Sequence, residues 1–259
     1  MTWAHATNSL NEFEEAISSS SVSAIECDII MSSDHPPEPI LAHPPCRESD
    51  LTVRRMLRLI VAPQKDEKSN LRKHLKLDFK EIEALEPTLD LILNSDFKNS
   101  LRKDIILNAD ILSGPGFDLN DCSIVPPSTF IETCLVYIQR LREKNPEIKF
   151  GFSLGFKCDW QSTEGYLSAQ VSQMSDLVGR YQLASSNFGV KVILALNARQ
   201  LGKSLLVFDE FLREYPTSTI LAWTGSGEPP IPKHEVCEIS DYYESKMMRD
   251  KIEFDCCVD

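Results

Sequence analysis

Short runs of Ile, Val, Leu and Phe alternate along the chain with longer stretches in which apolar residues recur every three or four positions. Short apolar runs of this kind are typical of strands that are covered on both faces of a parallel sheet. The pattern predicts strands at Trp3–Thr7, Ala24–Ile30, Leu75–Lys80, Ile105–Ala109, Lys149–Leu154, Val190–Leu196, Ser218–Trp223 and Lys251–Asp255, with a shorter extended segment at Pro39–His43.

The stretches between these strands have helical periodicity. It is clearest where Leu135, Ile138 and Leu141 fall on one stripe of a helix. The predicted helices are Leu10–Ser18, Leu51–Val61, Ile82–Leu93, Phe130–Arg142, Tyr166–Tyr181, Leu205–Tyr215 and Val236–Met248.

Eight strands with helices in the gaps favour the α/β fold class, and eight is the strand number of a (β/α)₈ TIM-type barrel. The chain has 259 residues, a usual length for such a barrel, and no long polar linker divides it. We therefore expect one domain over residues 1–259. An open doubly wound sheet and a division into two smaller domains are the alternatives.

The net charge of −12 disfavours binding to nucleic acid or to anionic membranes. No apolar run reaches the roughly 18 residues that a membrane-spanning helix needs, so we expect no transmembrane segment. The first residues do not resemble a signal peptide, which predicts a cytoplasmic location. The eight cysteines form no C-x-x-C pair, and we expect free thiols, with Cys27 buried.

Carboxylates are predicted to cluster at the mouth of the barrel. Side chains alternate along a strand, so Glu26 and Asp28 share one face of the second strand, opposite Ile25, Cys27 and Ile29. Two buried like charges are costly unless a cation binds them, and Mg²⁺ or Ca²⁺ takes oxygen ligands. A solvated acidic face is the alternative interpretation.

The third long strand repeats this arrangement. Asp78 and Lys80 share a face, so Asp78 is predicted as a third metal ligand and Lys80 as a partner for a phosphate or a carboxylate. Lys76 falls on the same face, and we place it at the lower rim of the barrel. A surface Asp/Lys pair is the alternative.

Two of the five histidines lie near these strand ends. His5 lies in the first strand and His43 directly after the second. Two imidazoles near one phosphate can act as general base and general acid, since their pKa lies near neutrality. We interpret His35, His74 and His234 as structural. Residues predicted only to line the pocket are Asn8, Asn108, Asp110, Ser153, Asn197 and Trp223, which can equally cap helices or pack in the core.

The order of these motifs resembles a known superfamily. An H-x-x-N motif, an I-E-x-D-I motif, a histidine about fifteen residues later and a D-x-K motif are similar to the barrel phosphodiesterases, which include glycerophosphodiester phosphodiesterases and sphingomyelinase D. Over nearly its full length the chain resembles the menorin family more closely. The matching segments are Trp3–Asn8, Ile25–Asp28, Ala42–Pro45, Leu75–Lys80, Glu86–Pro87 and Trp223–Gly225.

This resemblance implies a phospholipase C-like barrel that binds Mg²⁺, Ca²⁺ or Mn²⁺ and acts on a small-molecule or lipid phosphodiester. Water or an internal hydroxyl of the substrate would be the attacking group. It also implies an extracellular location for some members, against the cytoplasmic expectation. A non-catalytic binding or signalling protein on the same barrel is the alternative function. An aldolase that uses Lys80 is a third, and the adjacent carboxylates disfavour it because they keep the amine protonated.

Overall fold

The computed structural model describes residues 2–61, 73–95, 104–117, 124–185, 190–225 and 227–259. The strands in these ranges lie close to the predicted ones. They are β1 (Trp3–Ala4), β2 (Ala24–Met31), β3 (Pro39–Leu41), β4 (His74–Phe79), β5 (Ile105–Ser113), β6 (Phe150–Lys157), β7 (Lys191–Asn197), β8 (Thr219–Trp223) and β9 (Ile252–Asp255).

Helices occupy most of the intervals between these strands. The α-helices are α1 (Leu10–Ser18), α2 (Val53–Val61), α3 (Leu85–Leu93), α4 (Pro127–Lys144), α5 (Ser168–Arg180), α6 (Ala198–Gly202), α7 (Asp209–Glu214) and α8 (Lys233–Ser245). Short 3₁₀ helices are η2 (Ile82–Ala84), η3 (Leu205–Phe208) and η4 (Arg249–Lys251). Among the described residues, no helix is both long enough and apolar enough to cross a membrane.

The strand order is β1-β2-β4-β5-β6-β7-β8-β9, with β3 paired to β2 alone. Neighbouring strands in chain order, with helices between them, are the arrangement of a (β/α)₈ TIM-type barrel. The predicted fold class is therefore confirmed. The chain divides into two compact units, the first formed by Met1–Ala109 and Val125–Gly151 and the second by Asp110–Ile124 and Phe152–Asp259. The expectation of a single domain stays a prediction.

In the first unit, β2 lies between β1 and β4, and both pairings are parallel. Strand β1 is shorter than predicted because Ala6 adopts a φ of 50°, which ends the extended backbone. The amide of Thr7 then donates to the carbonyl of Glu26 at 2.9 Å. The segment after β1 is thereby fixed against β2, and this contact positions the residues around His5.

The two faces of β2 and β4 have different neighbours in the first unit. The ring of Phe79 lies 6.0 Å from that of Phe130 in α4. The pKa of the buried Cys27 thiol is raised mainly by burial, then by the charges of Glu26 and Asp28, and also by that of Glu12 in α1. Cys27 and Phe79 therefore face helices, as predicted. Since side chains alternate, Glu26, Asp28 and Asp78 point to the opposite face.

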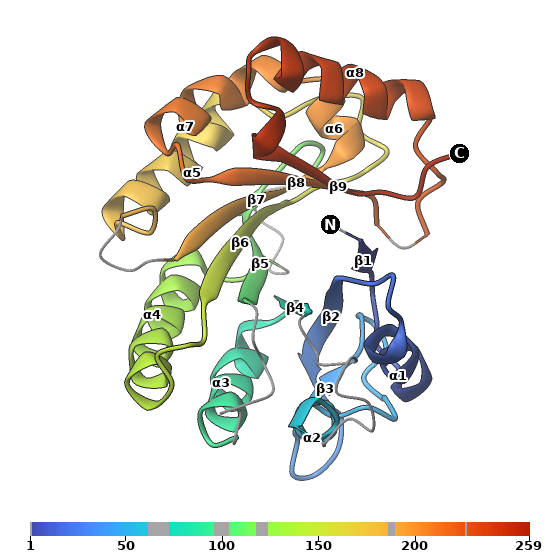
Figure 1. Cartoon of the computed structure of the whole chain (residues 1–259), viewed down its shortest axis with the longest axis vertical. Coiled ribbons are helices and arrows are strands. Elements are labelled where there is room, and N and C mark those ends of the chain that lie inside the picture. Colours follow the sequence, from blue (N-terminus) through green and yellow to red (C-terminus); the bar gives the residue numbers. More distant parts are fainter. Residues whose placement is uncertain (1, 62–72, 96–103, 118–123, 186–189, 226) are drawn as a thin grey trace. The chain divides into compact units, whose positions relative to one another are not determined.

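In the second unit, β7, β8 and β9 pair in parallel, and α5, α7 and α8 run along one side of these strands (Figure 1). One predicted helix differs in detail, because the segment before Tyr215 forms η3 and then α7. The five-residue helix α6 was not predicted, since its sequence ARQLG is too short to show a period. The sequence also indicates a charged connector at 63–73, and residues 63–72 of it lie outside the described residues.

Candidate metal centre

Three carboxylates from adjacent parallel strands converge within the first unit. Asp28 of β2 is the register partner of Asp78 of β4, and Glu26 is the register partner of Lys76. One oxygen from each of Glu26, Asp28 and Asp78 lies within 4.8 Å of the others. All three residues are buried, with exposed fractions of 2%, 3% and 9%. Clustered carboxylate oxygens are the donor set that Mg²⁺, Mn²⁺ and Ca²⁺ prefer, so these residues fit such an ion.

Lys80 lies between the two aspartates. Its Nζ is 3.0 Å from Oδ1 of Asp28 and 2.6 Å from Oδ2 of Asp78. Burial by itself would raise the pKa of Asp78, but the charges of Lys80 and Lys76, together with hydrogen bonds from Lys80 and Asn108, lower it to about 2. Asp78 is therefore ionised at neutral pH, as a metal ligand must be.

For Glu26, the effects that raise the pKa outweigh those that lower it. Burial, followed by the neighbouring charge of Asp28, raises the pKa of Glu26, and the charges of Lys76 and His5 only partly oppose this. Its Oε2 accepts a hydrogen bond of 2.7 Å from the amide of Ala6. The site thus holds one carboxylate whose negative charge is incompletely compensated, and an added cation would favour its ionised form.

Two asparagines orient the aspartates. The Nδ2 of Asn8 donates to Oδ2 of Asp28 at 2.7 Å, while its Oδ1 accepts from the backbone amide of Asp28 at 2.9 Å. The Nδ2 of Asn108 donates to Oδ1 of Asp78 at 2.6 Å. The buried Oδ1 of Asn108 has no hydrogen-bond partner among the described residues. An unsatisfied buried acceptor next to the carboxylates is a feature that a bound ion or its water could satisfy.

The structure places both predicted histidines beside the strands that carry the carboxylates. His5 is exposed, and its charge reaches Glu26. His43 is also exposed; it follows Ala42, whose amide donates to the carbonyl of Asp28 at 3.1 Å. The Nδ1 of His43 lies 2.7 Å from the carbonyl oxygen of Pro44. Because a carbonyl oxygen only accepts, this contact places the proton on Nδ1 and leaves Nε2 as the basic nitrogen.

The model for the menorin N-terminal domain matches residues 1–250. The chain belongs to the menorin family. It is 28% identical over 253 residues to human Protein FAM151B, and this match covers 96% of the chain and 80% of the human protein. No solved structure is significantly similar to the chain.

In this menorin-family chain, the region that matches the family model includes the three clustered carboxylates, Glu26, Asp28 and Asp78. Lys76 is the member of the site that sequence reasoning missed. We placed it at the lower rim of the barrel, and that placement stays a prediction; the structure shows it buried, with an exposed fraction of 4%, and its Nζ 5.8 Å from the centre of the Trp3 ring at the start of β1. Its shared face with Asp78 was the available signal, because strand alternation directs both inward.

The remaining predicted pocket residues belong to the second unit: Asp110, Ser153, Asn197 and Trp223. Asn197 caps α6, since its side chain accepts from the amide of Arg199 at 3.1 Å, and its Nδ2 donates to Glu228 at 2.8 Å. Ser153 is fully buried, and its Oγ has no partner among the described residues. Trp223 ends β8 and is half-buried. A pocket role for these residues stays a prediction.

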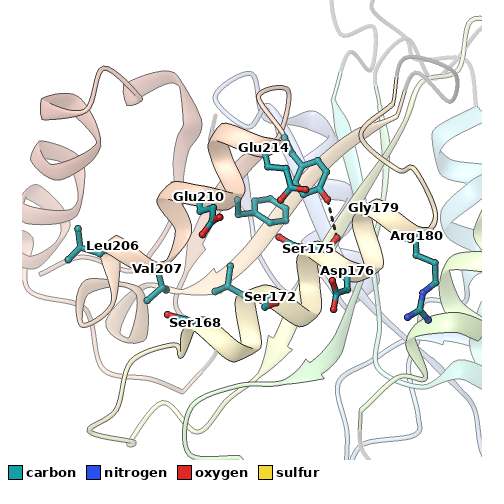
Figure 2. Close-up of a pocket in the computed structure, with 13 residues that line it drawn as sticks. Ser168, Ser172, Ser175, Asp176, Gly179, Arg180, Leu206, Val207, Glu210 and Glu214 are labelled. Atoms are coloured by element: carbon teal, nitrogen blue, oxygen red, sulfur yellow. Dashed lines mark hydrogen bonds between the residues drawn. The ribbon is translucent and has the colours of Figure 1, made fainter.

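A groove of about 790 Å³ lies on the helical side of the second unit. Figure 2 shows Ser168, Ser172 and Ser175 of α5 along one wall, with Leu206, Val207 and Glu210 on the opposite wall. The hydroxyl of Tyr215 donates across it to the carbonyl of Ser175 at 3.1 Å. None of the residues predicted for the site lines this groove, so it adds nothing to the candidate metal centre.

Proposed function

We propose that this menorin-family protein is a metal-dependent phosphodiesterase-like enzyme that acts on a small-molecule or lipid phosphodiester. The observation that carries the proposal is the cluster of buried carboxylates of Glu26, Asp28 and Asp78, within 4.8 Å of one another. Burying this much negative charge on adjacent strands is costly, and a divalent cation offsets the cost.

Glu26, Asp28 and Asp78 would hold Mg²⁺ or a similar ion, which supplies Lewis-acid polarisation of a phosphoryl oxygen when bound. Lys80 contributes a positive charge next to two of these ligands. A cation at that position can stabilise the charge that develops on a phosphoryl group in the transition state.

The two histidines divide the proton transfers. His43 has Nε2 free to accept a proton, because Nδ1 is committed to the Pro44 carbonyl, and we assign it the general base. His5 lies near enough to the Glu26 carboxylate for the two charges to interact, and we assign it the general acid. The attacking group is water or a hydroxyl within the substrate.

A panel of glycerophosphodiesters and choline- and ethanolamine-containing phospholipids, assayed with Mg²⁺, Mn²⁺ or Ca²⁺, tests the proposal. We expect turnover that chelation abolishes. His5→Ala and His43→Ala should each lower the rate about 10²–10⁴-fold, since each removes one positioned acid or base, while metal binding is retained. The double variant should lose less than the product of the single losses, because both groups serve one transition state.

His234→Ala is the matched control, because His234 is exposed at the start of α8, and the variant should keep full activity. Unchanged rates in His5→Ala and His43→Ala would refute the acid–base assignment. Absence of turnover across the panel, with metal binding intact, would favour the alternative of a non-catalytic binding protein on the same fold.

A further inference from the structure

A second lysine, Lys76, is buried on the same strand face as Asp78. Lys76 precedes Asp78 by two residues in β4 and is the register partner of Glu26 in β2. Its exposed fraction is 4%, and the indole of Trp3 lies against its ammonium group at 5.8 Å. A lysine is almost never buried to this extent unless its charge is compensated, and the charge of Lys76 interacts with the carboxylates of Glu26 and Asp78.

A cation bound at the site would affect Lys76 and Lys80 differently. The ammonium of Lys80 contacts oxygens of Asp28 and Asp78 directly, and its side chain keeps an exposed fraction of 17%. An ion bound by the two aspartates would compete with Lys80 for their carboxylates, so Lys80 is an exchangeable counter-ion. Lys76 lies two register positions before Asp78 in β4, beside Glu26 and against the ring of Trp3, and can stay in place when an ion binds.

We propose that Lys76 is a permanent internal counter-cation of the acidic site, which stabilises the metal-free protein and lowers the affinity of the site for a divalent cation. The inference rests on the proposed metal centre. Three carboxylates and two lysines leave one negative charge uncompensated when all five groups are ionised. Without Lys76 the excess becomes two, which penalises the empty site and attracts a cation more strongly.

The inference predicts effects of opposite sign on two measurable quantities. In Lys76→Met, which removes the charge and keeps the length of the side chain, the metal-free protein should melt at a lower temperature than wild type. The same variant should bind Mn²⁺ about tenfold more tightly in calorimetric titrations of the full chain. A residue needed only for packing would lower the melting temperature and leave the affinity unchanged or weaker.

Two further variants complete the experiment. Lys191→Met removes a half-exposed lysine that starts β7 and lies 3.8 Å from Glu253, so both quantities should match wild type. In Lys76→Met/Glu26→Gln, loss of the carboxylate should restore much of the metal-free stability, because the two groups form one coupled pair. Lys76→Gln supplies the affinity measurement if the Met variant does not fold.

The outcomes separate this inference from the proposed function. Mn²⁺ binding by wild type, with equal or weaker binding by a folded Lys76→Met or Lys76→Gln variant, would overturn the inference alone. Failure of wild type to bind Mn²⁺, Mg²⁺ or Ca²⁺ would overturn the metal centre, and the inference with it. Tighter binding together with a less stable metal-free protein is the result that supports it.

Discussion

In the candidate metal centre, Glu26 is a carboxylate whose burial is not matched by the positive charges around it. Its carboxyl group is buried beside Asp28, and its pKa is raised from 4.5. When a carboxyl has a higher pKa in the folded than in the unfolded chain, its ionisation lowers the free energy of unfolding. Its unfavourable contribution is therefore absent below about pH 4.5 and grows as the pH rises through the folded-state pKa.

Glu26→Gln should remove this pH dependence, because Gln keeps an acceptor for the amide of Ala6 and carries no charge. We expect the metal-free variant to melt above wild type at neutral pH and to converge with it near pH 4. Thermal unfolding in EDTA from pH 4 to pH 8 measures the difference. Glu48→Gln, at an exposed position, should follow wild type throughout. A constant offset between Glu26→Gln and wild type at every pH would contradict the charge argument.

The cysteines also differ residue by residue. Cys27 and Cys134 are buried free thiols whose pKa values burial raises well above 9.0. The thiols of Cys46, Cys237 and Cys257 are free and exposed, and Cys122 lies outside the described residues. Because the thiolate is the reactive form, iodoacetamide should modify the exposed cysteines in the native protein, and Cys27 and Cys134 only after denaturation. Peptide mass spectrometry distinguishes the two groups, and detection of Cys27 in a disulfide would refute its placement.

At the scale of elements, the start of helix α1 is tied to the site. Asn8, which orients Asp28, immediately precedes the capping box of α1. In that box the Oγ of Ser9 accepts from the amide of Glu12 at 3.4 Å, and Oε2 of Glu12 accepts from the amide of Ser9 at 3.0 Å. The box therefore fixes both the helix and the segment that carries Asn8.

Ser9→Ala should destabilise the protein by about 1 kcal/mol, the usual cost of losing an N-cap side chain. In a chain of this size that corresponds to a melting temperature lower by about 2–4 °C. Urea unfolding monitored by circular dichroism measures the change. Ser18→Ala, at the other end of α1, serves as the control, since the exposed Ser18 donates to the carbonyl of Glu14 within the helix and caps no helix start. Equal stability of the two variants would show that the capping box contributes nothing.

At the scale of the whole molecule, metal binding and folding should be linked. An ion that binds only the folded chain stabilises it by RT ln(1 + [L]/Kd), about 2.7 kcal/mol at a hundredfold excess over Kd. Mg²⁺ should therefore raise the melting temperature of wild type in differential scanning calorimetry. Glu26→Ala, Asp28→Ala and Asp78→Ala should each lose this response, because each removes one proposed ligand.

Asp209→Ala is the matched control for these variants. Asp209 is a buried aspartate of the second unit that accepts from Tyr242 at 2.9 Å and lies 3.4 Å from both Arg213 and Lys246. Its loss should lower stability with or without Mg²⁺ and leave the increment due to Mg²⁺ intact. An equal increment in wild type and all three site variants would exclude the carboxylate cluster as the binding site.

The alternation of apolar runs and helical periods was sufficient to predict the fold class and nearly all strand positions. The differences lie where local conformation overrides the pattern. Strand β1 ends early because Ala6 adopts a positive φ, and α6 is too short to have a readable period. Capping of a following helix was one of the two roles that the sequence offered for Asn197, and the structure shows it. The contact of Asn197 with Glu228 could not be read from the sequence, because it joins residues 31 positions apart.

The sequence by itself determined which face of its strand each candidate ligand occupies. Side chains alternate with a period of two, so Glu26 and Asp28 had to share a face, as did Lys76, Asp78 and Lys80. Only the tertiary structure decided which of these residues meet. The register of β2 against β4 sets Asp28 beside Asp78 and Glu26 beside Lys76, and it lets Lys80 reach both aspartates. Register depends on hydrogen bonds between strands about fifty residues apart, and a shift of one residue would have dispersed the cluster.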